Sequence, residues 1–335
     1  MRRTISPPLY NTKPTCLIYD DDGASFGHTW LVTKIWRCYK GMEEEEIRPI
    51  KRIHSRGVCR HSASINMALE ITPLGSGSRG NSTLLRSGST MVLIDCGFSL
   101  KQLELRLSRI NVNPLDIDGI FITHHHSDHA KSAKRASEKW DAILHCNPET
   151  AVRMGWAPIS ECRTFGNVER IQISDEMSLL PIPIPHDDAD NVAVIATNGD
   201  GHRAAIVTDL GEATHELKRH LNGCSHISIE ANYDEERLMN GPYPHSLKRR
   251  ISGRGGHLSN LQTAEILQDI MNPKLQSIVL CHLSEKNNAP HLAESEVLMH
   301  IGEEYSGTIS ISTQDGPDFT IRVGELKNED VKIRL

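Results

Sequence analysis

The pattern of hydrophobic and polar positions alternates between two periods from residue 67 onward. Short apolar runs bounded by Gly and Ser turns are typical of β-strands. We therefore expect strands at 69–74, 82–86, 91–95, 119–123, 142–145, 192–197, 204–208, 227–230, 276–281, 308–312 and 319–323. Between them, Leu100, Leu103, Leu107 and Ile110 share one helical face. Further helices are expected at 148–154 and 213–221, and at 260–271 behind a capping box that opens at Ser259. The pattern predicts strands in two sets with helices outside, a layered α/β domain.

Residues 1–66 show no sustained period. They contain an Asp run at 20–22 and a Glu run at 43–46, and hold 11 Lys and Arg against 7 Asp and Glu. This composition is typical of a poorly ordered extension. A second interpretation is that the segment is not translated, because Met67 opens an apolar stretch that fits a first strand. In either case we expect one folded domain over 67–335. A peptide from residues 1–66 in native protein would exclude the later start.

Composition places the chain among soluble globular proteins, with 38% hydrophobic and 24% charged residues in a length of 335. The formal charge of −6 is no nucleic-acid signature, although a local basic groove can still hold phosphates. The eight cysteines include no Cys-x-x-Cys pair, which favours reduced thiols in the cytoplasm. We find neither a signal peptide nor an apolar run of membrane-spanning length. Nothing in the sequence indicates the oligomeric state.

Potential metal ligands are most concentrated in the segment Thr123-His124-His125-His126-Ser127-Asp128-His129, which directly follows a predicted apolar strand. Neutral imidazole and carboxylate are ligands that zinc, manganese and related divalent ions accept. Alternation along the loop allows His124 and His126 to point one way while Asp128 and His129 point another. Two neighbouring ions could then share one loop. His125, between them, is expected only to pack or to face solvent.

A glycine-rich segment, Gly75-Ser76-Gly77-Ser78-Arg79-Gly80, matches the spacing of a dinucleotide-binding loop. The following residues predict a hairpin rather than a helix, so a pyrophosphate would find no helix N-terminus to bind. We interpret the segment as a tight turn beside the site, where backbone N–H groups could contact a phosphate. Ser76, Ser78 and Asn81 are its candidate substrate-binding residues.

Single polar residues follow several other predicted strands. Asp95, His186, Asp209 and His282 each come directly after an apolar run. Each alone has a plainer explanation, because Asp is common in turns and a lone His is often only hydrogen bonded. Together they resemble the way in which a sheet collects functional groups on loops at one edge.

The order Asp, His-x-His-x-Asp-His, His, Asp, His resembles the metallo-β-lactamase superfamily, and the resemblance covers 67–335. Seven short sequence motifs resemble those of the bacterial YycJ-like (WalJ-type) branch of that superfamily. They span residues 74–82, 93–97, 184–187, 208–211, 241–244, 256–260 and 282–288. The resemblance implies a four-layer αββα fold. It also implies hydrolysis with two metal ions, and exonuclease action on DNA from 5′ ends.

Carried over residue by residue, the resemblance implies that His124, His126 and His186 hold one ion. Asp128, His129 and His282 would hold the second ion, and Asp209 would bridge both. Asp95 would hydrogen bond to a ligating imidazole and orient it. His257 is the rival of His282 for the last position, and its place before a capping box fits a substrate-contacting or proton-donating role better. The expected catalytic residues are thus Asp128, Asp209 and His257.

The expected function is metal-dependent phosphodiester hydrolysis of DNA, in which a hydroxide activated by two Zn²⁺ or Mn²⁺ ions attacks phosphorus. Lys248, Arg249, Arg250 and Arg254 are candidates to line a groove for DNA phosphates, although a solvated charge run is an equal interpretation. The main alternative is a small-molecule hydrolase acting on a cyclic phosphodiester, a thioester or a lactone, because its metal core would be identical. A non-catalytic protein that keeps the fold is the other alternative.

Overall fold

The computed structural model describes residues 68–156, 162–187, 189–324 and 332–334. The proposed extension 1–66 lies outside the described residues. Each of the expected strands has a counterpart within two residues of its predicted ends, because a short apolar run between turn residues specifies a buried strand strongly. The apolar run before His186 corresponds to strand β8 (Met177–Ile184). Elements that the sequence did not predict include strand β7 (Ile171–Ser174) and the helices α4 (Ala133–Trp140), α7 (Glu235–Asn240), α8 (His245–Ile251) and α10 (Pro290–Ile301).

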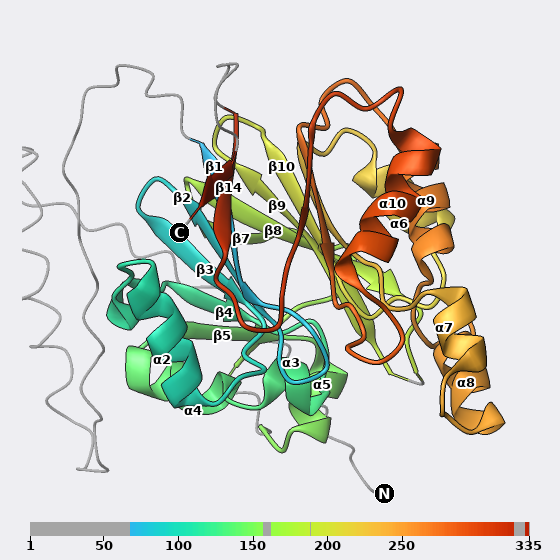
Figure 1. Ribbon diagram of the computed structural model, residues 1–335. Helices are drawn as coiled ribbons and strands as arrows, with labels where there is room; N and C mark the ends of the chain where they lie inside the picture. Colours follow the sequence, from blue (N-terminus) through green and yellow to red (C-terminus); the bar gives the residue numbers. More distant parts are fainter. Residues whose placement is uncertain (1–67, 157–161, 188, 325–331, 335) are drawn as a thin grey trace, which may run out of the picture. The chain divides into compact units, whose positions relative to one another are not determined.

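Two mixed sheets form the centre of the described chain (Figure 1). The first runs in the order β15 (Lys332–Arg334), β14 (Phe319–Val323), β1 (Leu69–Gly75), β2 (Ser82–Ser87), β3 (Thr90–Ile94), β4 (Gly119–Phe121), β5 (Ile143–Cys146) and β6 (Arg163–Thr164). The second runs in the order β13 (Thr308–Ile311), β12 (Ser277–Cys281), β11 (His226–Glu230), β10 (Arg203–Val207), β9 (Asn191–Asn198), β8 and β7. The predicted hairpin at 199–201 joins β9 to β10, which pair antiparallel.

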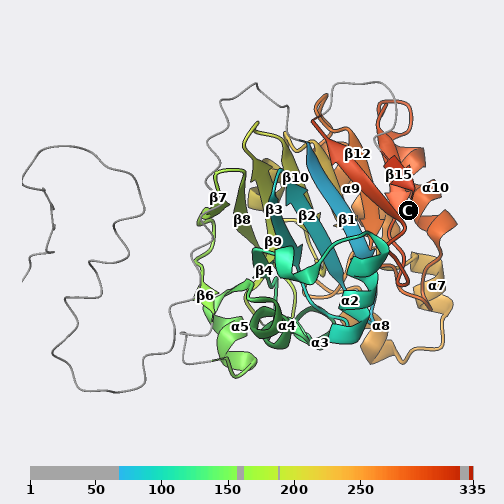
Figure 2. The same ribbon diagram turned by 90° about the vertical axis from the view of Figure 1, so that its left-hand side faces the viewer.

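Helices cover the outer faces of both sheets (Figures 1 and 2). The first sheet carries α2 (Leu100–Arg109), η1 (Pro114–Asp116), α3 (Ser127–Ala130), α4 (Ala133–Trp140) and α5 (Pro148–Arg153). The second carries α6 (His215–Leu221), α9 (Asn260–Asp269) and α10 (Pro290–Ile301). The short helices α7 (Glu235–Asn240) and α8 (His245–Ile251) lie below these three in Figure 1. The capping box predicted at Ser259 is present at the start of α9. Among the described helices, none combines the length and apolar character that a membrane span needs.

Buried apolar side chains form three clusters, one for each interface between layers. One lies between the sheets and includes Phe121, Val194 and Ile321, all at most 1% exposed. A second packs α2 and α4 against the first sheet, and a third packs α6, α9 and α10 against the second sheet. Three interfaces between four layers confirm the expected αββα architecture.

Candidate metal centre

Loops that follow five strands bring the predicted ligands to one edge of the sheets. Asp95 and the His124–His129 loop follow β3 and β4, while His186, Asp209 and His282 follow β8, β10 and β12. Strands β3 and β4 run parallel to each other, as do β10, β11 and β12. The carboxyl ends of parallel strands meet at one edge of a sheet, so residues distant in sequence become neighbours.

One candidate group consists of three imidazoles. His124, His126 and His186 each offer a nitrogen, and these atoms all lie within 4.8 Å of one another. Nδ1 of His186 donates to the carbonyl of Gly256 at 2.8 Å, which turns its Nε2 toward the group. Nδ1 of His124 lies 3.1 Å from Oγ1 of Thr123. Three nitrogen donors in such proximity form a set that suits Zn²⁺.

The second candidate group combines a carboxylate with two imidazoles. Ligand atoms of Asp128, His129 and His282 also lie within 4.8 Å of one another. Nδ1 of His129 donates to Oδ2 of Asp95 at 2.7 Å, as predicted for Asp95 from the resemblance. His282, rather than its rival His257, is the imidazole grouped with Asp128 and His129.

Asp209 lies between the two groups. Its Oδ2 is 2.6 Å from Nε2 of His129, and its Oδ1 is 3.8 Å from Nε2 of His186 and 3.6 Å from Nδ1 of His282. The side chain is buried, with 4% of its surface exposed. A single carboxylate therefore faces imidazoles from both groups, which is the position that a bridging ligand requires.

Electrostatics in this cluster are dominated by burial and by close pairs. Burial and the neighbouring His129 lower the pKa of His124 well below its usual value, so this ring is neutral and has a lone pair to donate. Although burial opposes the shift, the carboxylates of Asp209, Asp128 and Glu230 around the ring raise the pKa of His282 to about 10. Although burial opposes it too, His282 and His129 hold the pKa of Asp209 well below its usual range. Protons and metal ions compete for these atoms, so metal binding would release protons.

The donor set fits a divalent cation. Nε2 of His124 and Nε2 of His282 are buried and have no hydrogen-bond partner among the described residues. A buried polar atom without a partner is costly, and a cation would satisfy both nitrogens. In His129, His186 and His282, a carboxylate or carbonyl accepts from Nδ1, so that Nε2 is the nitrogen directed toward the other candidate ligands.

Glu230, at the end of β11, is a site residue that the sequence reasoning missed. The side chain is fully buried, and its Oε1 accepts from Nδ1 of His257 at 2.7 Å and from Nδ1 of His282 at 2.9 Å. Its Oε2 accepts from the backbone N–H of Leu210 at 2.7 Å. Although burial opposes it, the carboxylate of Glu230 raises the pKa of His257. The available signal was an acidic residue directly after an apolar strand, the same signal that identified Asp95 and Asp209.

Backbone strain is concentrated at these strand ends. Asp95, Asp209 and His282 have φ values of 64°, 52° and 53°, in the left-handed region that residues with a Cβ rarely adopt. The loops are also tightly packed, because a Cβ added to Gly97 would lie 1.6 Å from the carbonyl oxygen of Asp128. Such strain persists only where the surrounding structure imposes it, and it is common at functional sites.

The structure changes the interpretation of the glycine-rich turn. Ser76 and Asn81 are buried, and the Oγ of Ser76 donates to Oδ1 of Asn81 at 2.9 Å. The Oγ of Ser76 also accepts from the N–H of His282, and Nδ2 of Asn81 lies 3.0 Å from Nε2 of His129. Their polar atoms are already engaged in holding the candidate ligands, so the expectation that they bind substrate is not supported by their positions. Ser78 instead lines the open pocket described below.

The basic residues near α8 differ sharply from one another. Lys248 is buried and its Nζ donates to the carbonyl of Met239 at 2.6 Å, so it is unavailable to a phosphate and its predicted role is wrong. Arg254 pairs with Glu212. Arg250 pairs with Asp187 at 3.1 Å, while Arg249 is exposed and makes no contact of this kind in the described structure. His125 is half-buried and belongs to neither ligand group, as expected.

A pocket of about 230 Å³ opens onto both ligand groups. The residues that line this pocket are Ser78, His126, Asp128, His186, Asp187, Asp209, Leu247, Arg250, Ile251, Gly256, His257 and His282.

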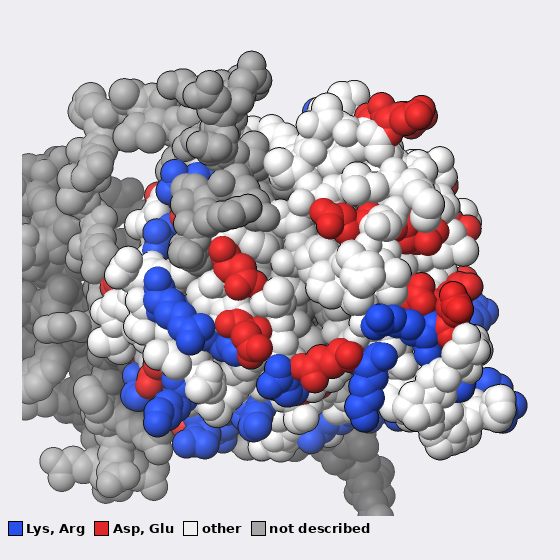
Figure 3. All heavy atoms as spheres, in the orientation of Figure 1, with Lys and Arg blue, Asp and Glu red and all other residues white. Residues whose placement is uncertain are grey.

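Lys and Arg side chains gather along the lower part of the face in Figure 3, where Figure 1 places α2, α4 and α8.

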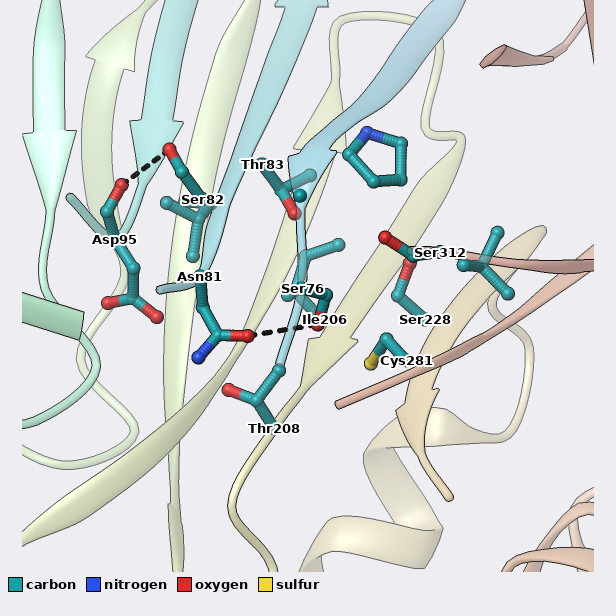
Figure 4. Close-up of a pocket in the computed structure, with 14 residues that line it drawn as sticks. Ser76, Asn81, Ser82, Thr83, Asp95, Ile206, Thr208, Ser228, Cys281 and Ser312 are labelled. Carbon is teal, nitrogen blue, oxygen red and sulfur yellow. Dashed lines mark hydrogen bonds between the residues drawn. The ribbon is translucent and has the colours of Figure 1, made fainter. Parts of the chain in front are cut away.

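A second cavity lies between the sheets, behind the ligands (Figure 4). Its volume is about 10 Å³, which leaves room for roughly one water molecule. Ser82 donates to the carbonyl of Asp95 in its wall, and Thr208 directly precedes Asp209. This cavity is too small for a substrate and belongs to the layer of residues that supports the ligands.

Comparison with known proteins identifies a family and two similar enzymes. The family model for the metallo-β-lactamase superfamily matches residues 75–243. The exodeoxyribonuclease YycJ of Bacillus anthracis is 30% identical over 253 residues, which are 72% of this chain and 92% of the relative. The exodeoxyribonuclease WalJ of Streptococcus pneumoniae is 30% identical over 240 residues, 69% of this chain and 87% of the relative.

Solved structures support the fold. The metallo-β-lactamase fold protein YhfI from Bacillus subtilis superposes with a TM-score of 0.58 at 14% identity, covering 76% of this chain and 99% of that protein. The family match spans about half of the chain, and the exodeoxyribonuclease relatives align over most of their own length. The chain therefore belongs to the metallo-β-lactamase superfamily and is a hydrolase of that superfamily.

Proposed function

We propose that this protein is a metal-dependent phosphodiesterase that removes nucleotides from the ends of DNA. The observation that carries the proposal is the pair of ligand groups on either side of Asp209, in a chain 30% identical to exodeoxyribonucleases along most of their length. Two such sites sharing a carboxylate are common in enzymes that cleave phosphodiesters.

Two divalent ions, Zn²⁺ or Mn²⁺, are proposed to bind at these groups. His124, His126 and His186 would hold one, Asp128, His129 and His282 would hold the other, and Asp209 would contact both. When bound, such ions supply Lewis acidity, which lowers the pKa of water and offsets negative charge on phosphate oxygens. Asp95 and Glu230 hold three of the surrounding imidazoles in fixed orientations through Nδ1.

His257 is proposed to protonate the leaving oxygen. Its Nδ1 donates to Glu230, which leaves the proton on Nε2 available, and the side chain lines the pocket. Although burial opposes it, the Glu230 carboxylate raises the pKa of His257, which favours the protonated ring that a proton donor needs. A group that donates a proton must lie beside the reacting phosphate rather than bind a metal ion. We therefore propose His257 as the proton donor and His282 as the metal ligand.

Arg250 is proposed to contact a phosphate of the substrate. It lines the pocket, and 68% of its side-chain surface is exposed. Arg249 and Arg254 lie outside the lining, so their contribution would be limited to long-range attraction, which salt screens strongly.

The test is nucleotide release by purified protein supplied with Mn²⁺ or Zn²⁺. Substrates are linear single-stranded and duplex DNA with 5′ phosphates, closed circular DNA and RNA of the same sequence. We expect mononucleotides from linear DNA and no cleavage of the circle. Asp209→Asn should abolish release, while the exposed Glu236→Gln on α7 serves as the matched control. Cleavage of the closed circular DNA would contradict the proposal, and so would a protein that degrades RNA but not linear DNA. Turnover of only a simple aryl phosphodiester would favour the small-molecule alternative.

A further inference from the structure

One wall of the metal-facing pocket is a single face of α8. Leu247, Arg250 and Ile251 line the pocket at positions i, i+3 and i+4, which lie together on a helix surface. Both aliphatic residues are half-buried and line the pocket. The wall therefore combines one cation with two apolar side chains within about one turn of helix.

This wall is held in place by contacts at the middle and at the C-terminal end of α8. The buried Lys248, in the middle of the helix, ties it to α7 through the carbonyl of Met239, at 2.6 Å. At the C-terminal end, the carbonyl of Ile251 accepts from the N–H of His257 at 2.8 Å. The apolar side chains therefore keep a fixed position relative to the candidate proton donor, and such a preorganised surface binds with little ordering cost.

From this arrangement we propose that Leu247 and Ile251 form the binding site for the nucleoside part of the substrate. The proposal rests on the proposed function and specifies its substrate as one unpaired nucleotide of any base. A nucleotide has a charged phosphate and an adjoining, largely apolar nucleoside, which matches the ligand groups and Arg250 beside the aliphatic wall. The two aliphatic side chains have no hydrogen-bonding group with which to distinguish one base from another.

The size of the pocket supports the same conclusion. Its volume of about 230 Å³ is small beside the ~300–1,000 Å³ of typical ligand pockets, which suits a single nucleotide better than a base pair or a stack of bases. A nucleotide must then leave its stack to reach the ligand groups. This requirement favours a chain end over the interior of a duplex, because a terminal nucleotide has fewer stacking and pairing contacts to lose.

Binding, rather than turnover, tests the proposal directly. Calorimetry with the Zn²⁺-loaded full chain compares inorganic phosphate with the four deoxynucleoside 5′-monophosphates. We expect each nucleotide to bind at least about tenfold more tightly than phosphate, because of apolar burial, with the four bases within about threefold of one another. The double variant Leu247→Ala and Ile251→Ala should lose this difference. The conservative pair Leu247→Met and Ile251→Val should restore it.

The matched control is Met239→Ala on α7, whose side chain is 55% exposed and does not line the pocket. Metal content and thermal unfolding, measured for every variant, identify any loss that comes from misfolding. Equal affinity for phosphate and nucleotides would overturn the proposal, as would a double alanine variant that keeps the difference. Preferential nucleotide binding without DNA degradation would refute the proposed exonuclease function and leave the nucleoside site standing.

Discussion

Replacing Glu230 with glutamine removes one negative charge from the network behind the metal centre while it preserves the size of the side chain. In the native protein, Oε1 accepts from His257 and His282 at 2.7 and 2.9 Å, and Oε2 accepts from Leu210 at 2.7 Å. A glutamine has only one accepting oxygen. Either the Leu210 N–H or both imidazole N–H groups would then face an amide NH₂ and lose their acceptor.

The cost follows from this geometry. Glu230 is fully buried, so water does not replace the lost acceptor. One unpaired buried donor costs about 1–3 kcal/mol in the free energy of unfolding. Loss of a group that orients a metal ligand typically reduces metal affinity about 10–100-fold, which corresponds to roughly 1.4–2.8 kcal/mol.

Two measurements check the prediction. Competition with a chromogenic chelator gives the Zn²⁺ affinity of native protein, of Glu230→Gln and of Glu236→Gln, an exposed control. Urea unfolding in EDTA gives the stability without metal. We expect weaker metal binding and lower stability for Glu230→Gln only. Native-like Zn²⁺ affinity in a folded Glu230→Gln protein would refute the assigned role of this carboxylate.

Three further predictions concern other parts of the molecule. Burial lowers the pKa of His226 from its usual value of 6.5 to about 3. The neutral buried ring therefore contributes stability that is fully present above pH 6.5 and is lost as the pH falls toward 3. Without metal, the unfolding free energy of His226→Gln should therefore depend less steeply on pH between 6 and 4, by about 1.4 kcal/mol per unit, and parallel curves would contradict this. Arg250→Ala should raise KM for DNA about tenfold and reduce the salt dependence of binding more than Arg249→Ala does, and equal effects would remove Arg250 from the site. Gly97→Ala should weaken metal binding and destabilise the protein by roughly 3 kcal/mol, because the new Cβ meets a backbone oxygen. The matched Gly119→Ala, whose nearest contact is 3.6 Å away, should cost under about 1 kcal/mol if space is the cause.

The primary sequence singled out most residues of the candidate site, and the resemblance to the metallo-β-lactamase superfamily assigned their expected roles. Asp95, His186, Asp209 and His282 each follow an apolar strand, and the His124–His129 loop follows another. The local pattern of apolar residues predicts a buried strand. The polar residue that follows such a strand lies at the edge of the sheet, where functional groups collect. For the same reason most strands, and the helices α2, α5, α6 and α9, could be predicted with small errors at their ends, whereas α4, α7, α8 and α10 were missed.

Tertiary structure decided which polar side chains are available and which are already engaged. Lys248 and Arg250 are neighbours in one basic run, yet one is buried against a carbonyl and the other lines the pocket. Ser76 and Asn81 satisfy each other, and Glu230 becomes the shared acceptor for two imidazoles from distant segments. These outcomes depend on partners 5 to 52 residues away, and periodicity, which reports only local order, contains no information about them.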